Sequence, residues 1–236
     1  DFPAFLPSIG QLLNVGQPNA DTIYRSARIS PGGIYRIRGR KGSLNQIVLG
    51  QVAPHAEGAT RSHFDINSLE TDAKGRFDLL LSAERPEGYT GSWWELAPTA
   101  SMLLLRMVSC DWENEESPTF SIERLDRPMG RPRPPATDLE QRLRALPRTI
   151  DFMGLMFVDH VEQLRQEGYI NKLKEFDVGP IGGLVGQFYY ETVFELAHDE
   201  ALIIESPVPD VCPYRSLILT NEIYETIDWI NNHSCM

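Results

Sequence analysis

Two different spacings of hydrophobic residues divide this chain into a β-rich part and a helical part. In the first 128 residues, short runs of β-branched, aliphatic and aromatic residues alternate with turn residues, at intervals typical of a β-sandwich or barrel. The turn sequence from Ser30 to Gly33 predicts that the two runs beside it pair as a β-hairpin. The expected strands are 22–29, 34–38, 44–52, 61–66, 76–83, 102–108 and 119–125.

After this part the apolar residues take on helical spacing. The proline-rich bridge 127–135 cannot lie inside a sheet, and a helix start follows it. Apolar residues then recur every three or four positions, which predicts two successive helices that meet near Pro147, with helical character to about Phe176. The segments 201–204 and 214–219 return to strand character.

The expected fold class is therefore α+β and mainly β: a β-sandwich or jelly-roll-like body with an excursion of two to three helices. The chain has 236 residues, of which 42% are hydrophobic, and this is enough to bury a core without disulfides or metals. In chain order we expect an irregular entry at 1–20, the first part of the sandwich at 21–128, the bridge and helical insertion at 129–178, and a return to the β body at 179–236.

Charge and hydropathy exclude two classes of partner. The net charge of −11 argues against nucleic acid, whose binding depends on basic residues. No apolar run reaches the 18 or more residues of a membrane span. We expect a cytoplasmic protein, although Asp1 in place of methionine leaves a cleaved leader as the alternative.

The charges are unevenly distributed along the chain. Seven basic residues and two acids lie in 21–61, whereas nine acids and one base lie in 191–236. The two regions either face each other around a polarised cleft or are separately solvated.

Common catalytic motifs are missing from the sequence. The glycine-rich segment 179–186 matches neither a phosphate loop nor a dinucleotide fingerprint, so we expect no cofactor. A weak metal hypothesis rests on His63 and Asp65, which share one face of a strand, with His55 approaching from the preceding loop.

Arg106 is the most informative single residue. It interrupts an apolar strand, where an arginine is costly unless it has a partner, and acids follow the strand end. It either bridges strands or clamps a substrate anion. Asp111 beside Trp112 is the expected proton carrier, with a pKa raised by partial desolvation, and Glu115 is a possible partner of Arg106.

A tryptophan pair, Trp93 and Trp94, follows a glycine-containing loop. On a loop such a pair serves either as a lid over the core or as the wall of a binding pocket.

Several separated motifs together resemble the bacterial domain-of-unknown-function family 1214. The resemblance covers most of 18–128 and 200–236. It implies a β-rich, jelly-roll-like fold and no known catalytic roles. The motifs are NADTIYRSARI, YRIRGRKG, KGRFDLLLSAERPEGYTGSWWELAP, LLLRMVSCDWENEESPTFSIERLD and CPYRSLILTNEIYETIDWINNHSCM.

The polar and aromatic residues at motif positions imply a common pocket. Two departures from the family pattern concern the C-terminal motif: Arg215 stands where a tryptophan is frequent, and a further strand segment usually follows the region that ends at Met236. The motif positions are Asn19, Asp21, Tyr24, Tyr35, Arg36, Gly39, Trp93, Arg106, Asp111, Trp112 and Glu115.

The leading functional hypothesis is a hydrolase or lyase of small-molecule catabolism. Its substrate would be aromatic or alicyclic, held by Tyr24, Trp93 and Trp112, with Asp21 or Asp111 moving a proton. The alternatives are a non-catalytic ligand-binding module and an interaction subunit that docks through its tryptophans. The segment 223–230 contains more apolar residues than a terminal segment usually exposes, which predicts a homo-oligomer, most simply a dimer.

Overall fold

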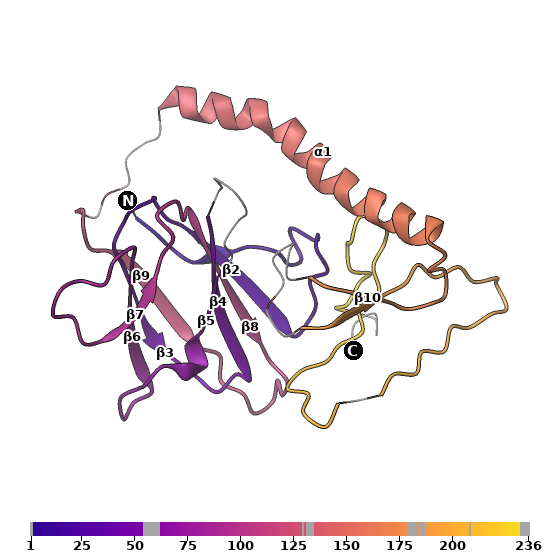
Figure 1. The fold of residues 1–236 in the computed structure, drawn as a ribbon, viewed down its shortest axis with the longest axis horizontal. Coiled ribbons are helices and arrows are strands. Elements are labelled where there is room, and N and C mark those ends of the chain that lie inside the picture. Colours follow the sequence, from indigo (N-terminus) through magenta and orange to yellow (C-terminus); the bar gives the residue numbers. More distant parts are fainter. Residues whose placement is uncertain are drawn as a thin grey trace.

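The computed structural model describes residues 2–53, 62–128, 130, 135–178, 184, 187–207 and 209–231. Within these residues two β-sheets face each other, and a long helix leads from above them to a small two-stranded sheet (Figure 1). This arrangement confirms the mainly β, α+β fold with a helical insertion.

The first layer of the sandwich is a five-stranded sheet with β8 (Met102–Val108) at its centre. Beside β8 lie β2 (Thr22–Arg28) and β4 (Gln46–Val52), both antiparallel to it. The short strands β1 (Leu6–Pro7) and β5 (His63–Asp65) form the two edges. β8 is thus paired along both edges, and its alternate residues Leu103, Leu105 and Met107 are buried.

The second layer is a four-stranded sheet in the order β7-β6-β3-β9. β3 (Tyr35–Arg40) pairs antiparallel with β6 (Arg76–Ser82) and with β9 (Thr119–Arg124), whereas β7 (Ser92–Glu95) runs parallel to β6. A short 3-10 helix, η1 (Ile66–Ser68), follows β5.

The core lies between the two sheets. Alternate residues point inward because successive side chains of a strand face opposite sides. The fully buried side chains include Leu103 and Leu105 of the first sheet and Tyr35, Ile37 and Leu79 of the second.

The predicted hairpin between β2 and β3 is wrong. β2 pairs with β1 and β8, and β3 pairs with β6 and β9, so the turn crosses from one sheet to the other. The Tyr35 hydroxyl accepts a hydrogen bond from the backbone N–H of Ser30 at 2.7 Å and fixes this crossing. A turn sequence marks the reversal of the chain but not the sheet in which the next strand pairs.

The helical insertion is a single helix, α1 (Ala136–Gln166), rather than the expected two or three. Pro147 lies inside it. Proline removes one helix hydrogen bond, but Ala145 and Leu146 before it and Arg148 after it favour helix. In the part of the chain that is described, no helix has the length and apolarity needed to cross a membrane.

α1 ends ten residues earlier than the pattern predicted. Gly168, at φ +83°, provides the left-handed residue that commonly ends a helix. The chain then forms β10 (Lys174–Phe176), which pairs antiparallel with β11 (Tyr189–Glu191). The strands expected at 201–204 and 214–219 are wrong, because neither segment forms a strand in the structure.

Candidate functional site

Arg106 lies on the outer face of the five-stranded sheet. Its neighbours Leu105 and Met107 point into the core, so strand alternation turns Arg106 outward. In the register of the sheet, Arg106 stands between Tyr24 of β2 and Val48 of β4. The arginine is therefore half-buried on a surface and not enclosed in the apolar core.

Arg106 reaches across neighbouring strands to two polar aromatic residues. One of its terminal nitrogens, Nη1, lies 3.3 Å from Nε2 of His63 on β5, and its guanidinium carbon lies 6.0 Å from the centre of the Tyr24 ring. A guanidinium over an aromatic face gains cation–π attraction. These contacts fit the hypothesis that Arg106 bridges strands. These two partners are a histidine and a tyrosine, whereas the sequence suggested a carboxylate as the partner of Arg106.

A third aromatic residue, Tyr189 of β11, joins this group from the C-terminal region. Burial raises the pKa of the Tyr189 hydroxyl, with a further increase from Tyr24 and an opposing effect of Arg106. Tyr189 therefore lies within electrostatic range of Tyr24 and Arg106. We call Tyr24, His63, Arg106 and Tyr189 the Arg106 cluster; it lies where the C-terminal region meets the sandwich.

The two phenols of the cluster are neutral hydrogen-bond donors at physiological pH. Burial raises the pKa of Tyr24, although the charge of Arg106 and a hydrogen bond to it act in the opposite direction. A phenol with a raised pKa keeps its proton. The cluster therefore presents one permanent cation and two O–H groups to whatever occupies its outer side.

A second polar group continues from the cluster into the C-terminal region. Glu191 lies two residues after Tyr189, on the same face of β11, and its Oε2 is 2.7 Å from Nε2 of His160 on α1. Tyr224 stacks on Phe157 of α1 with the ring centres 4.6 Å apart. Burial raises the pKa of Tyr224 well above its ordinary range, and the nearby Glu191 raises it further. This group fixes the C-terminal half of α1.

The structure brings together Asp21, Asn19 and Trp112, but at the end of β2 and not around Arg106. Trp112 Nε1 donates to Asp21 Oδ1 at 3.1 Å, and the Tyr214 hydroxyl donates to Oδ2 at 2.9 Å. The side-chain oxygen of Asn19 accepts the backbone N–H groups of Asp21 and Thr22. Trp112 is 65% exposed, so it forms no enclosed pocket wall.

Asp111 and Glu115 organise the turn after β8. The carboxylate of Asp111 accepts the side-chain amide of Asn114 and the backbone N–H groups of residues 113 and 114. These hydrogen bonds lower the pKa of Asp111, the reverse of the expected rise. Glu115 accepts the Ser109 hydroxyl at 2.6 Å and the backbone N–H groups of residues 45, 110 and 111, so its described bonds are to the turn and not to Arg106.

Trp93 and Trp94 belong to strand β7 and not to a loop. Trp93 donates from its indole nitrogen to the Ser82 hydroxyl at 2.9 Å, and Trp94 packs against Phe64, with 5.7 Å between ring centres. Both side chains are half-buried. Trp94 covers the core, while Trp93 is anchored to β6.

The metal hypothesis finds little geometric support. His55 lies outside the described residues, His63 contacts Arg106, and Asp65 accepts the backbone N–H of Asn67 at 2.8 Å as the cap of η1. Among the described residues, no group of three or more histidine, cysteine, aspartate or glutamate side chains could hold a metal ion.

Sequence reasoning missed Tyr189, Glu191, His160 and Tyr224. They come from α1, from β11 and from the segment around Tyr224, and their meeting depends on how α1 packs against β10 and β11. The alternation of Tyr189 and Glu191 was a usable signal, but a run of three residues is too short to identify a strand.

Comparison with family models and with curated proteins finds no match for this chain. Among solved structures it is similar to an uncharacterized protein from Burkholderia cenocepacia, with a TM-score of 0.83 and 23% sequence identity. The alignment covers 100% of this chain and 66% of that chain, so this chain spans slightly less than two thirds of its neighbour's length. At this level of identity the likeness establishes the fold alone.

Proposed function

We propose that this chain binds a small aromatic or alicyclic carboxylate at the Arg106 cluster. The observation that carries the proposal is the half-buried guanidinium of Arg106 on the outer face of the five-stranded sheet, in contact with the His63 imidazole and the Tyr24 ring. The guanidinium and the two phenols can donate hydrogen bonds to an oxyanion, and arginine does so with two parallel N–H groups.

The same residues suit the apolar part of such a ligand. Tyr24 and Tyr189 each have an apolar ring with a polar tip, which allows the ring to pack on a ligand while its hydroxyl binds oxygen. Ligand sites commonly combine apolar walls with a few convergent polar groups and lie between structural units. The cluster combines aromatic rings with a small number of polar groups.

Binding without catalysis fits this geometry better than the hydrolase or lyase hypothesis. That hypothesis needs a carboxylate able to exchange a proton near neutral pH. Asp111 has a lowered pKa and an exposed position, and both oxygens of Asp21 accept hydrogen bonds from aromatic side chains. Neither residue has a described contact with the Arg106 cluster. The docking hypothesis is weakened as well, because Trp93 and Trp94 are held within the sandwich.

We also propose that this chain is related to family 1214, which its motifs resemble, and that it is cytoplasmic. Family 1214 implies the same kind of β-rich body and a pocket that includes Tyr24 and Arg106. Location is checked by fractionating cells that produce the protein from its natural gene.

Isothermal titration calorimetry with benzoate and benzamide tests the proposal. The two probes have the same ring, and only benzoate carries the anionic group. We expect benzoate to bind more tightly than benzamide, and Arg106→Met to weaken benzoate binding by about 10- to 100-fold, since a hydrogen bond to a charged group contributes about 1.5–3 kcal/mol.

Arg25→Met is the matched control, because Arg25 is exposed on the same strand as Tyr24 but points to the other side. It should leave benzoate binding unchanged. Circular dichroism checks that both variants fold. Equal affinity for the two probes, or equal loss in both variants, would refute the proposal.

A further inference from the structure

A row of arginines lies on the outer face of the four-stranded sheet, on the opposite side of the sandwich from the Arg106 cluster. Arg36, Arg38 and Arg40 alternate along β3 with the core-facing Tyr35 and Ile37. Like charges in a row repel one another, so a folded sheet needs anions beside them.

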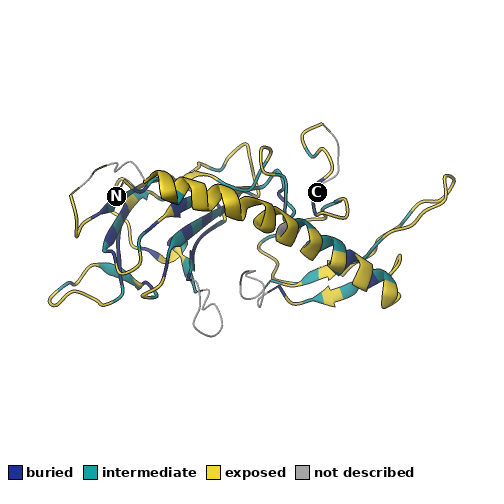
Figure 2. Ribbon diagram, turned by 90° about the horizontal axis from the view of Figure 1, so that it is seen from above, coloured by how far each residue is buried: buried dark blue, intermediate teal, exposed yellow. Residues whose placement is uncertain are grey.

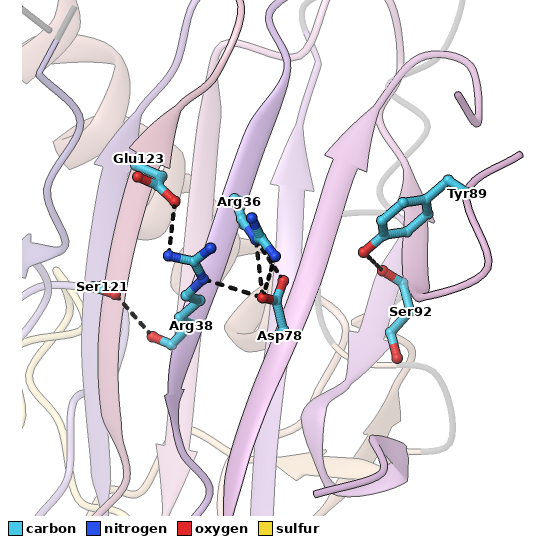
Figure 3. A network of polar contacts seen from close by, with 7 residues as sticks. All are labelled: Arg36, Arg38, Asp78, Tyr89, Ser92, Ser121 and Glu123. Carbon is cyan, nitrogen blue, oxygen red and sulfur yellow. Dashed lines mark hydrogen bonds and ion pairs between the residues drawn. The ribbon is translucent and has the colours of Figure 1, made fainter. Parts of the chain in front are cut away.

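Two acids neutralise one end of this row (Figure 3). Asp78 on β6 accepts from Nη2 of Arg36 at 2.6 Å and from Nε of Arg38 at 3.1 Å. Glu123 on β9 lies 3.3 Å from Nη1 of Arg38. Burial acts to raise the pKa of Asp78, but its hydrogen bonds with the two arginines hold it below the ordinary value. This end of the row is fully paired.

At the other end two guanidiniums lie on neighbouring strands. Arg40 stands directly opposite Arg76 of β6 in the register of the sheet, where side chains are closest. Arg76 pairs with Asp72 at 2.7 Å. The backbone N–H of Arg40 donates to the Thr119 hydroxyl, but its guanidinium has no ion pair or hydrogen bond within the described part of the chain.

A groove of about 850 Å³ lies over this end of the sheet. Its volume is in the range of small-molecule sites. Besides Arg38, Arg40 and Arg76, it is lined by hydroxyl groups and by acids that accept hydrogen bonds. These are Ser92, Thr119, Ser121, Glu70, Asp72 and Asp78.

We propose that this groove binds a phosphate or sulfate ester of a polyhydroxylated molecule. The anionic group lies between Arg40 and Arg76, where it relieves the repulsion of the two guanidiniums. Arg76 keeps its contact with Asp72, because a guanidinium has five N–H donors. The hydroxyls of the ligand donate to the acids beside the arginines.

The acidic residues of the groove favour a polyhydroxylated ligand over a long polyanion. A long polyanion would be repelled by Glu70, Asp72 and Asp78, whereas the hydroxyl groups of a polyol need such acceptors. A compact ligand with one anionic group and several hydroxyls can bind both the arginines and the acids of the groove.

Titration of the protein with glucose 6-phosphate, followed by NMR or calorimetry, tests this proposal. We expect glucose 6-phosphate to bind more tightly than either glucose or inorganic phosphate. Arg40→Met should weaken that binding by about 10-fold or more, because it removes a charge-assisted contact. Arg28→Met, an exposed arginine of the other sheet, is the matched control and should leave the binding unchanged.

Three results would overturn the proposal. One is the absence of binding at millimolar concentration, and another is the same affinity in wild type and Arg40→Met. The third is equal binding of inorganic phosphate and glucose 6-phosphate, which would remove the polyol from the assignment. None of these results depends on the Arg106 cluster, so the two proposals can fail separately.

Discussion

The sandwich and the region that begins with α1 differ in how they treat their apolar residues. The sandwich buries leucine, isoleucine and tyrosine side chains between two sheets, whereas α1 is exposed along most of its length (Figure 2). The exposed apolar residues of α1 are Leu139, Leu143, Leu146, Ile150, Phe152, Leu155 and Met156.

The apolar stripe on α1 has the pattern of a helix face that packs against another surface. Leu139, Leu143, Leu146 and Ile150 follow one another at intervals of four, three and four residues, which is the spacing of a helix–helix seam. The seam continues to Phe157, where Tyr224 covers it. The same stripe is therefore packed at one end of α1 and open at the other.

The total exposed surface supports this contrast. The chain exposes 15,907 Å², compared with ~10,700 Å² for a compact monomer of its mass. The sandwich supplies its own core, while the C-terminal region depends on the few residues that anchor α1. Stability should therefore be concentrated in the sandwich, and the following substitutions test this difference.

The largest expected effect comes from a cavity in the core of the sandwich. Leu79 is 0% exposed, and Leu79→Ala should lower the free energy of unfolding by about 2–5 kcal/mol. Leu143 of α1 is 59% exposed, so Leu143→Ala should change it by less than about 0.5 kcal/mol. Urea denaturation measures both. Similar losses in the two variants would remove the contrast between the regions.

The next effect concerns an ion pair that the sequence did not reveal. The guanidinium of Arg124 is 3% exposed and donates to both oxygens of Asp126, at 2.8 and 3.0 Å. This contact lowers the pKa of Asp126 to about 2. Asp126→Asn should cost about 2–4 kcal/mol at pH 7, because it removes the carboxylate from a buried guanidinium.

The pH dependence of this loss follows from the lowered pKa. The stabilisation is complete above the unfolded-state pKa of about 4 and is lost as the pH falls toward about 2. The difference between wild type and Asp126→Asn should therefore shrink over that interval in acid titrations of stability. A difference that stays constant from pH 7 to pH 2 would contradict the assignment.

The smallest effect on unfolding is expected from a charge on the open stripe of α1. Ile150→Glu should leave the unfolding free energy nearly unchanged, since Ile150 is already exposed. The dimer expected from the apolar residues of 223–230 remains a prediction. If the open stripe of α1 also joins two copies, Ile150→Glu should convert a dimer to a monomer in light scattering. A monomer in both proteins would remove α1 as a self-association surface.

Most strands of the sandwich were predictable because each one is a local pattern, although β7 was interpreted as part of a loop. The expected strand 102–108 coincides with β8, and the alternation of Leu103 and Leu105 places Arg106 on the outer face. The pairing of β2 and β3 with distant strands was not predictable from the turn between them. Pairing depends on contacts between residues far apart in the chain.

The candidate site was predictable only in part, for the same reason. Tyr24 and Arg106 lie on adjacent strands, and the resemblance placed them in one pocket. His160 and Glu191 meet across 31 residues, and Tyr189 comes within electrostatic range of Arg106 from a separate two-stranded sheet. Asp111 was misjudged because the turn amides that lower its pKa leave no clear mark in the sequence.

Hydrogen–deuterium exchange with and without benzoate tests most directly whether the Arg106 cluster is a ligand site that joins the two regions. A ligand held by Tyr24, Arg106 and Tyr189 should slow amide exchange in β2, β8 and β11 together, because local opening of either region would then release it. The four-stranded sheet should be unaffected. Unchanged exchange in β11, or protection confined to β3, β6 and β9, would contradict the account.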